Sequence, residues 1–373
     1  MTQTVVTVSN TAQFNAAVVA ASQAGSGPET ILLAPGVYDG LQIYNKTIAA
    51  SLTIQSEYAA RPAVLEDFRL QLTNNVTVQG VTFSNTQLSN AYGNAEAQIF
   101  DSNNIAIKNS TFTGNPSDQT AAIAGNGIYV NGGSNISVSS NMFEYLHVGL
   151  VHTNADGLTV SGNVFQYIFN DGVDGGNSNN VSILGNYFTN MHMDPTDTEH
   201  PDAIQFWTAS NTSNTENITV EYNTYVRGVG AAVQGIFITS QNGFGYDNVT
   251  VEHNSISGAA YNGIWVDSAS NVTVENNVVQ PYADMISRLI LSSDSSGVVQ
   301  SNEVGTQLVQ LDPVTVSESA NTTLAAIANP TVSTFVSAMA AINTAGSVQP
   351  STTTGATAVA HSLTNFLTVI SRI

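Results

Sequence analysis

A short alternation of apolar and polar residues recurs along most of the chain. Each copy has a polar pair, then an apolar–x–apolar segment, then an aromatic or aliphatic residue seven places after the first apolar one. Self-similarity at a short period is the signature of a solenoid, and short alternating segments rich in Val and Ile indicate strands. Clear copies are NNVTVQGVTF (74–83), SNISVSSNMF (134–143), DGLTVSGNVF (156–165), NNVSILGNYF (179–188) and SNVTVENNVV (270–279).

A second apolar segment follows in most copies, with Gly and Asn turns between the segments. The segments begin GIYV (127), GLVH (149), GVDG (172), AIQF (203), GIFI (235) and GIWV (263), and the shortest full period is 22 to 23 residues. Each repeat is therefore expected to form one coil, with successive coils stacked in parallel. One register of the repeat holds asparagine, which we interpret as a structural ladder of amide hydrogen bonds: Asn141, Asn163, Asn186, Asn223, Asn254 and Asn277.

The pattern divides the chain into three parts. Residues 1–27 are expected to form a strand and a helix that caps the stack, because Phe14, Ala17, Val18 and Ala21 fall on one helical face within 11–24. Residues 28–312 are the coils. Residues 313–373 form an Ala/Thr-rich extension with expected helices at 324–343 and near the end, where the last segment either packs on the final coil or acts as an export signal.

The pattern resembles the right-handed parallel β-helix of the pectate-lyase-like superfamily over roughly residues 28 to 310. ETILLAPGVYDGLQI (29–43) and LTIQSEYAARPAVL (52–65) are similar to the first coils of secreted polysaccharide lyases. The resemblance implies an all-β fold, a single right-handed parallel β-helix with a helical N-terminal cap and a helical C-terminal tail. It also implies a monomer that acts on an extracellular polysaccharide.

The amino-acid composition excludes several other classes of function. The chain has 373 residues, only seven Lys and Arg, no cysteine and a net charge of −20. It therefore has no basic surface for nucleic acid or anionic lipid, and no thiol chemistry. We also see no apolar stretch long enough to span a membrane and no N-terminal secretory signal, so an extracellular location would need another export route.

One insertion concentrates chemical groups that are rare elsewhere. The stretch MHMDPTDTEHPDAIQFW (191–207) holds His192, His200 and four acids, and the coil that contains it takes 22 residues from Val181 to Ala203 where compact coils take 13 or 14. Long loops on a rigid scaffold are where sites are usually built. Candidate Ca²⁺ ligands in it are Asp194, Asp197 and Glu199.

Stacking the second segments predicts an outward-facing patch. Carboxylates one coil apart repel, so one is expected to have a raised pKa or to share a cation. Aromatic rings beside acids suit sugars, which offer apolar faces and hydroxyl edges. The patch holds Asp171, Asp174 and Asp202, flanked by Gln205, Trp207, Phe237 and Trp265.

The first functional hypothesis is β-elimination from, or C5-epimerisation of, a uronic-acid polymer such as alginate. Both reactions need a base, an acid and a group that neutralises the sugar carboxylate. We assign His200 as the base, His192 or Tyr129 as the acid, and Ca²⁺ or Arg227 as the neutralising cation, with the three patch acids assisting. DPTDTEH is similar to the Asp-Pro-His-Glu motif of mannuronan C5-epimerase modules at Asp194 and Pro195, although Thr196 stands in place of the histidine.

Two alternatives remain. Asn170-Asp171-Gly172-Val173-Asp174 is similar to a motif of polygalacturonase-type hydrolases, in which acids on adjacent coils cleave the glycosidic bond, here with Asp202 on the next coil. The other alternative is a non-catalytic surface or carbohydrate-binding protein.

Overall fold

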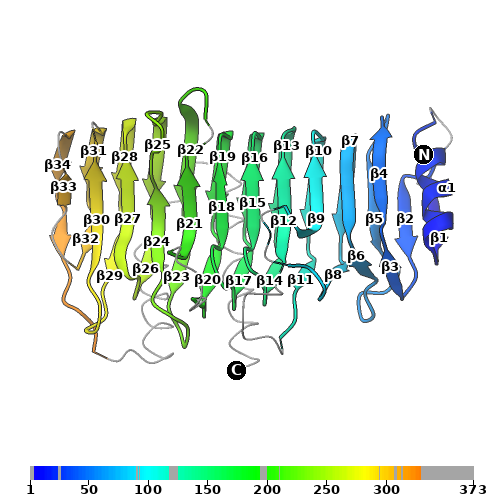
Figure 1. Cartoon of the computed structure of the whole chain (residues 1–373), viewed down its shortest axis with the longest axis horizontal. Coiled ribbons are helices and arrows are strands. Elements are labelled where there is room, and N and C mark those ends of the chain that lie inside the picture. The colour runs from blue at the N-terminus through cyan, green and yellow to red at the C-terminus, as the bar shows by residue number, and fades with distance from the viewer. Residues whose placement is uncertain are drawn as a thin grey trace.

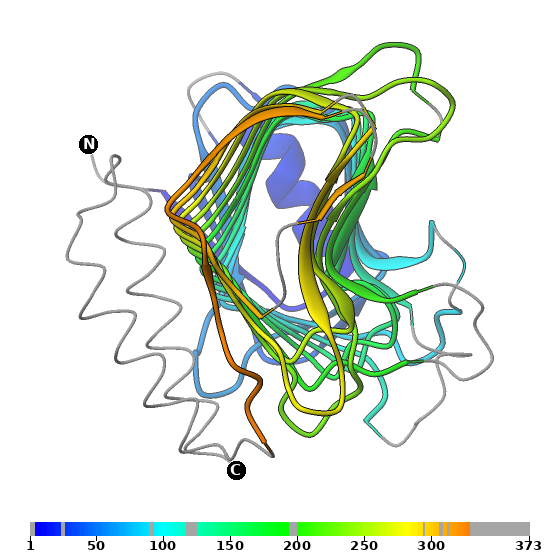
Figure 2. The same ribbon diagram turned by 90° about the vertical axis from the view of Figure 1, so that its left-hand side faces the viewer.

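The computed structural model describes residues 4–23, 27–89, 91, 93–116, 125–193, 200–209, 211–293, 295–305, 309–311 and 314–328. These residues form one stack of parallel coils that runs the length of the molecule (Figure 1). The view along the stack in Figure 2 shows successive coils superposed around a common axis. The expected all-β parallel fold is therefore confirmed.

Each coil contributes a strand to each of three parallel sheets. Sheet A holds the first apolar segments of the repeat. Its members are β1 (Val5–Val8), β2 (Thr30–Leu33), β5 (Leu52–Ser56), the second half of β7 (Phe68–Gln79), β10 (Asn103–Lys108), β13 (Ser134–Ser139), β16 (Asp156–Ser161), β19 (Asn179–Leu184), β22 (Thr215–Glu221), β25 (Tyr246–Glu252), β28 (Ala269–Glu275), β31 (Ser296–Gln300) and β34 (Thr315–Ser319).

Sheet B is made of short strands that begin one or two residues after a turn. Its members are β3 (Val37–Asp39), β6 (Val64–Glu66), β8 (Thr82–Phe83), β11 (Thr111–Thr113), β14 (Met142–Glu144), β17 (Val164–Gln166), β20 (Tyr187–Thr189), β23 (Thr224–Val226), β26 (Ser255–Ser257), β29 (Val278–Gln280), β32 (Glu303–Val304) and β35 (Thr322–Thr323).

Sheet C holds the second apolar segments of the repeat. Its members are β4 (Gln42–Lys46), the first half of β7, β9 (Ala95–Phe100), β12 (Asn126–Asn131), β15 (Leu150–Thr153), β18 (Val173–Gly176), β21 (Asp202–Trp207), β24 (Gln234–Ile238), β27 (Tyr261–Asp267), β30 (Ser287–Ser292) and β33 (Val309–Leu311).

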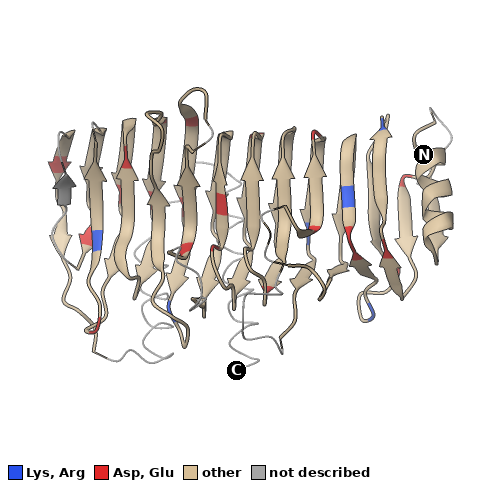
Figure 3. Ribbon diagram, in the orientation of Figure 1, with Lys and Arg blue, Asp and Glu red and all other residues tan. Residues whose placement is uncertain are grey.

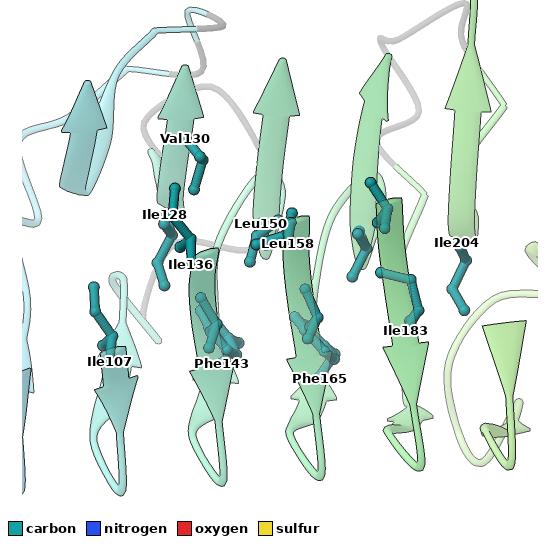
Figure 4. Packing of buried hydrophobic residues seen from close by; sticks show 14 of the residues in the cluster. Ile107, Ile128, Val130, Ile136, Phe143, Leu150, Leu158, Phe165, Ile183 and Ile204 are labelled. Atoms are coloured by element: carbon teal, nitrogen blue, oxygen red, sulfur yellow. The ribbon is translucent and has the colours of Figure 1, made fainter. Parts of the chain in front are cut away.

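The core lies inside the coils and is continuous along the stack. Side chains at inner positions of the three sheets, such as Ile128, Ile136 and Phe143, point toward one another (Figure 4). The aromatic residues of the repeat stack on one another within this core. The ring centroids are 4.3 Å apart between Phe83 and Phe112, and 4.8 Å apart between Phe165 and Phe188. Identical residues at one register therefore pack on one another coil after coil.

The asparagine column is a buried hydrogen-bonded ladder, as predicted. Asn163 donates to Val138 O (2.9 Å) and to Asn186 Oδ1 (3.0 Å), and its own Oδ1 accepts from the backbone N–H of Asn141 (2.9 Å). The same bonds repeat from coil to coil, so each amide satisfies the backbone of the turn between sheets A and B. The ladder continues beyond the predicted members through Asn302 to Asn321.

The two ends of the stack differ. α1 (Thr11–Ala21) begins after the N-cap Asn10 and buries Phe14, Ala17 and Val18 on the first coils, as expected for a cap. The expected end of the coils at residue 312 is too early, because β34 and β35 pair in register with β31 and β32. The alternating segment 315–319 lacks the polar Asn pair, which is why the repeat was not recognised there.

The structure describes residues 314–328 of the C-terminal extension. Residues 324–328, expected to begin a helix, are instead irregular, with Ile327 bridging to Tyr282 in parallel. The remainder of both expected C-terminal helices lies outside the described residues.

Candidate functional site

The outer face of sheet C carries the columns predicted from the sequence. Strand pairing aligns Asp174 with Gln205, Gln205 with Phe237, and Phe237 with Trp265. At the start of the strands, Asp202 aligns with Gln234. Successive coils therefore place these side chains about 4.8 Å apart along the stack.

His200 and Asp202 form a hydrogen-bonded pair where the loop from β20 enters β21. His200 Nδ1 lies 3.1 Å from Asp202 Oδ2. The imidazole is 52% exposed, whereas the carboxyl is fully buried at 0%. The second carboxyl oxygen, Oδ1, is buried without a hydrogen-bond partner. A buried carboxyl thus holds a half-exposed imidazole through Nδ1, and a carboxyl–imidazole pair is suited to proton transfer.

The carboxyl of this pair titrates unusually. Burial raises the pKa of Asp202 from 3.8 to about 6, and the hydrogen bond and charge of His200 oppose that shift. A raised pKa was predicted from repulsion between stacked carboxylates, but its principal cause is desolvation. The proton occupancy of the pair therefore changes just below neutral pH.

Asp171 and Asp174 are held by hydrogen bonds from the next coil. Asp171 Oδ1 accepts from the backbone N–H of Asp202 at 2.6 Å, and Asp174 Oδ1 accepts from Trp207 Nε1 at 2.7 Å. In the orientation that satisfies its amide, Gln205 donates to Asp171 Oδ2 (3.2 Å) and Asp174 Oδ1 (3.3 Å). One amide nitrogen therefore joins the two carboxylates.

The acids point outward, as alternation predicted, but they are covered. Asp171 is 3% exposed and Asp174 is 6% exposed. Trp207 lies back over the neighbouring coil, where a Cβ on Gly176 would come within 2.5 Å of the Trp207 side chain. The absence of a side chain at Gly176 thus makes room for the indole that caps Asp174. The acids were expected to form an open cluster. Instead, the side chains of Trp207 and Gln205 cover them, and we call this surface, together with Phe237 and Trp265, the wall.

Aromatic rings continue the wall beside the imidazole. The ring of His200 packs edge-to-face on Phe237 with centroids 4.7 Å apart, and Phe237 packs the same way on Trp265 at 5.2 Å. Trp265 Nε1 donates to Ser292 Oγ at 2.7 Å, which fixes the indole. Partly exposed indoles with polar edges are suited to sugar rings.

The two candidate acids, His192 and Tyr129, have contacts of their own. His192 stacks on the rings of Tyr167 and Phe169, with centroid distances of 5.8 and 5.5 Å, and desolvation lowers its pKa. A neutral imidazole is a poor proton donor at neutral pH. Tyr129 lies three coils from Gln205, about 14 Å away, and its hydroxyl accepts from Asn131 Nδ2 at 3.2 Å. The coil spacing therefore separates Tyr129 from the His200–Asp202 pair, and the role of His192 as the acid stays a prediction.

Arg227, the residue predicted to neutralise the sugar carboxylate, forms an ion pair with Asp284. Its guanidinium forms two hydrogen bonds to Asp284, at 2.6 and 3.1 Å, and lies 4.6 Å from the ring centroid of Tyr282. Asp284 lies 57 residues further along the chain, so its approach was not visible in the sequence. This ion pair engages the guanidinium, and the role of Arg227 in neutralising a substrate carboxylate stays a prediction.

The candidate Ca²⁺ ligands Asp194, Asp197 and Glu199 lie outside the described residues. Within the described ranges, no three His, Asp or Glu side chains are grouped so that they could hold a metal ion. Calcium needs six to eight oxygen ligands, and the carboxylates of Asp171 and Asp174 already accept N–H donors. The Ca²⁺ assignment therefore stays a prediction.

The sequence reasoning missed two arginines on sheet C. Arg69, in the first half of β7, pairs with Gln98 in the column of Tyr129, and Arg288 on β30 donates to Asn262 Oδ1 at 3.1 Å. The alternating segment FRLQL (68–72) carried the signal for Arg69, because reading it as a sheet C strand places Arg69 on the outer face.

Comparison with known proteins identifies the fold. A family profile described as "Right handed beta helix region" matches residues 68–280. No curated protein matches the chain by sequence. Among the described residues, no helix combines the length and the apolar character needed to cross a membrane.

Solved structures of similar shape have diverse activities. The A-module of a mannuronan C-5 epimerase from Azotobacter vinelandii is 15% identical, with a TM-score of 0.54 over 87% of this chain and 96% of that one. A family 28 exopolygalacturonase from Yersinia enterocolitica is 12% identical, with a TM-score of 0.54 over 88% and 79%. PfbA, a surface adhesin of Streptococcus pneumoniae, is 14% identical, with a TM-score of 0.52 over 84% and 90%. At these identities the likeness establishes the fold alone.

Proposed function

Because the chain belongs to the family of right-handed β-helix proteins, we propose that it is an enzyme acting on an extracellular polysaccharide that contains uronic acids. In the proposed reaction His200 removes the proton next to a sugar carboxylate. The observation that carries the proposal is the exposed imidazole held by the buried carboxyl of Asp202. The mannuronan epimerase module and the exopolygalacturonase of similar structure support the substrate class.

Asp202 selects the form of His200 that can act as a base. Above pH about 6 the carboxyl is ionised and accepts the Nδ1–H of the imidazole. With the proton held on Nδ1, proton abstraction runs through Nε2. The positive charge that develops on the ring is then stabilised by a carboxylate in a desolvated environment.

The rings beside His200 would hold the sugar. Phe237 supports the imidazole, while Trp265 and Trp207 present partly exposed indoles on either side of it along the stack. Gln205 adds an amide at the same level. A sugar stacked on this wall has its C5 hydrogen directed at a fixed imidazole, which reduces the entropic cost of proton transfer.

Elimination can use one residue as base and acid, while the predicted Ca²⁺ would neutralise the sugar carboxylate. As the C5–H bond breaks, its electron pair forms the C4–C5 double bond and the bond from C4 to the glycosidic oxygen cleaves. The imidazolium then returns the proton to that oxygen, so one residue serves as base and acid. C5-epimerisation starts with the same abstraction, but a water molecule on the opposite side of the sugar then donates a proton to C5. The imidazolium gives its proton to the hydroxide that forms.

Hydrolysis is less well supported by the geometry. Two carboxyl groups must flank the scissile bond in such enzymes. Here Asp171, Asp174 and Asp202 are 3%, 6% and 0% exposed, and the first two accept hydrogen bonds from Trp207, Gln205 and the backbone. These acids hold the wall together beneath the surface that a glycan would contact.

The same burial favours a second candidate, a glycan-binding protein without turnover. A wall of indoles over hydrogen-bonded carboxylates can bind sugars without reacting with them, and an adhesin is among the similar structures. This candidate leaves the raised pKa of Asp202 and its pairing with an exposed imidazole without a purpose.

Substitution of the pair tests the proposal. We expect His200→Ala and Asp202→Asn to lower kcat/KM on a responsive polyuronate by roughly a hundredfold to ten-thousandfold, read as ultraviolet absorbance of the unsaturated product. His253→Ala is the matched control, because this half-buried histidine stacks on Tyr222 on sheet A, away from the wall. Full activity in His200→Ala would refute the assignment, and glycan binding without turnover across a substrate panel would favour the second candidate.

A further inference from the structure

The first coils of sheet C carry a second group of aromatic and polar side chains. Strand pairing aligns Tyr44 with Gln71 and Gln71 with Phe100, and in the adjacent column it aligns Arg69 with Gln98 and Gln98 with Tyr129. We name these residues the N-terminal patch: Tyr44, Arg69, Gln71, Gln98, Phe100 and Tyr129. All of them occupy outer positions of the sheet.

The N-terminal patch is accessible to solvent. Tyr44 is 55% exposed, which is unusual for a large ring, and the other five side chains are each partly exposed. A cluster of aromatic side chains exposed on a protein surface commonly marks a binding site.

Contacts between the side chains make the patch a fixed platform. The guanidinium carbon of Arg69 lies 4.4 Å from the ring centroid of Phe100. Phe100 packs edge-to-face on Tyr129 at 5.6 Å, and Asn131 donates to the Tyr129 hydroxyl at 3.2 Å. The rings are therefore held without a ligand, so binding costs little reorganisation.

Arg69 has hydrogen-bonding capacity that the described protein does not use. Its Nε is buried without a hydrogen-bond partner, and no acidic side chain in the described ranges forms an ion pair with it. Arg227, by contrast, is paired with Asp284. Lys and Arg are few on the ribbon and acids outnumber them (Figure 3). A buried charged donor without a partner costs free energy that an external oxyanion would offset.

The N-terminal patch is separate from the His200 site. Between the two sites, the outer side chains of β15 and β18 are covered from solvent, since Val151 is 0% exposed and Asp174 is 6% exposed. Tyr129, the nearest member of the patch, lies about 14 Å from Gln205 along the stack. The two surfaces can therefore be occupied independently.

We propose that the N-terminal patch is a second, non-catalytic binding site for an acidic polysaccharide. Arg69 binds an oxyanion on one sugar through its planar fork of N–H donors. Phe100, Tyr129 and Tyr44 pack on sugar rings. The side-chain amide of Gln71 binds hydroxyl groups, as does the amide oxygen of Gln98, whose Nε2 donates to Gly93 O at 3.0 Å. The proposal concerns attachment of the polymer and does not depend on the reaction assigned to His200.

Calorimetry with short acidic oligosaccharides tests the second site. The parent protein for the titration is the full chain carrying His200→Ala, so that the ligand is not consumed. We expect Arg69→Gln to weaken one binding event about tenfold and to leave any event at the His200 site unchanged. Arg61→Gln is the matched control, because it removes another arginine that lies over a ring, Tyr58, at 5.4 Å but between β5 and β6. The thermal midpoint of each variant establishes that the fold is intact.

A panel of oligosaccharides tests which chemical group the second site binds. Uronic and sulfated oligosaccharides decide which oxyanion Arg69 prefers, and a neutral oligosaccharide should bind Arg69→Gln and its parent alike. An unchanged isotherm for acidic ligands in Arg69→Gln, or an equal loss in Arg61→Gln, would overturn the proposal. If the His200 assignment is wrong, a single binding event remains and is still weakened by Arg69→Gln, so the two failures are distinguishable.

Discussion

The carboxyl of Asp202 sets the pH dependence of the proposed site. Its folded pKa is raised to about 6, so it gains a proton as the pH falls through that value. A protonated Asp202 no longer fixes the imidazole of His200 as a base. We therefore predict that kcat/KM is constant above pH 7 and falls about tenfold per pH unit below pH about 6.

The variant Asp202→Asn removes this titration. Its residual activity should be low at every pH, and its acid limb should move away from pH about 6, because the remaining imidazole must still be unprotonated to act as a base. A pH profile of Asp202→Asn that keeps the wild-type limb would assign the titration to another group.

His152 is a second residue whose titration has a measurable effect, here on stability. It is fully buried in sheet C, with Nδ1 3.1 Å from Ser178 Oγ and Nε2 without a partner, and burial lowers its pKa from 6.5 to about 4. The unfolded chain therefore binds more protons between these values. The free energy of unfolding is expected to decrease as the pH falls from about 6.5 to about 4, by roughly 3 kcal/mol from this group.

The substitution His152→Leu isolates that contribution. Urea midpoints at pH 7.5 and 5 should differ less in His152→Leu than in the wild type. The raised pKa of Asp202 acts in the opposite direction, stabilising the fold as pH falls from about 6, but it is present in both proteins and cancels. Equal pH dependence in the two proteins would contradict the assignment.

At the level of the structural element, the buried asparagine ladder holds the turns between sheets A and B. Asn223 donates to Ile183 O at 2.8 Å, and its Oδ1 accepts from both the backbone and side-chain nitrogens of Asn186. Asn223→Ala leaves these buried groups unsatisfied, and we predict a loss of about 3 kcal/mol in the free energy of unfolding by urea denaturation.

A second, exposed asparagine ladder provides the control. Asn217 donates to Asn180 Oδ1 at 2.8 Å on the surface and has a φ of 59°, which glycine can adopt without strain. Asn217→Gly should cost less than about 1 kcal/mol. Similar losses in both variants would show that burial of the ladder is not what matters.

The elements themselves were largely predictable because their residues repeat. The register that aligns Ile136, Leu158 and Val181 follows directly from copies of one pattern, and so does the alignment of Asp174 with Gln205. The sheet C strands at 68–72 and 95–100 were not predicted, because Asp67 and Glu96 stand where the later sheet C segments begin with Gly or Ala. Repetition predicts which column a residue occupies, and that is a property of local sequence.

The candidate site was only partly predictable because its contacts depend on packing. His200 and Asp202 are two residues apart, so their pairing was within reach of the sequence. The covering of Asp174 by Trp207 and the pairing of Arg227 with Asp284 join residues 33 and 57 positions apart. Such contacts depend on side-chain directions across coils, which a repeat pattern does not specify.

At the scale of the whole molecule, charge opposes the proposed substrate. A net charge of −20 repels a polyanion at long range, although the wall itself is largely aromatic and amide. Raising the ionic strength from 0.01 to 0.15 M shortens the Debye length from about 30 to about 8 Å. We predict that kcat/KM for a polyuronate rises severalfold over this range, whereas binding of a neutral oligosaccharide does not change. A steady fall of kcat/KM with salt would mean that cations dominate the encounter.

The central claim is that the His200–Asp202 pair removes the C5 proton of a uronic acid. The most direct measurement is NMR of polyuronates incubated with the protein in D₂O, combined with ultraviolet absorbance. The account predicts that a responsive polymer acquires either C4–C5 unsaturation or deuterium at C5, and that neither appears with His200→Ala. New reducing ends without unsaturation or deuterium at C5, or the same C5 chemistry in His200→Ala, would contradict it.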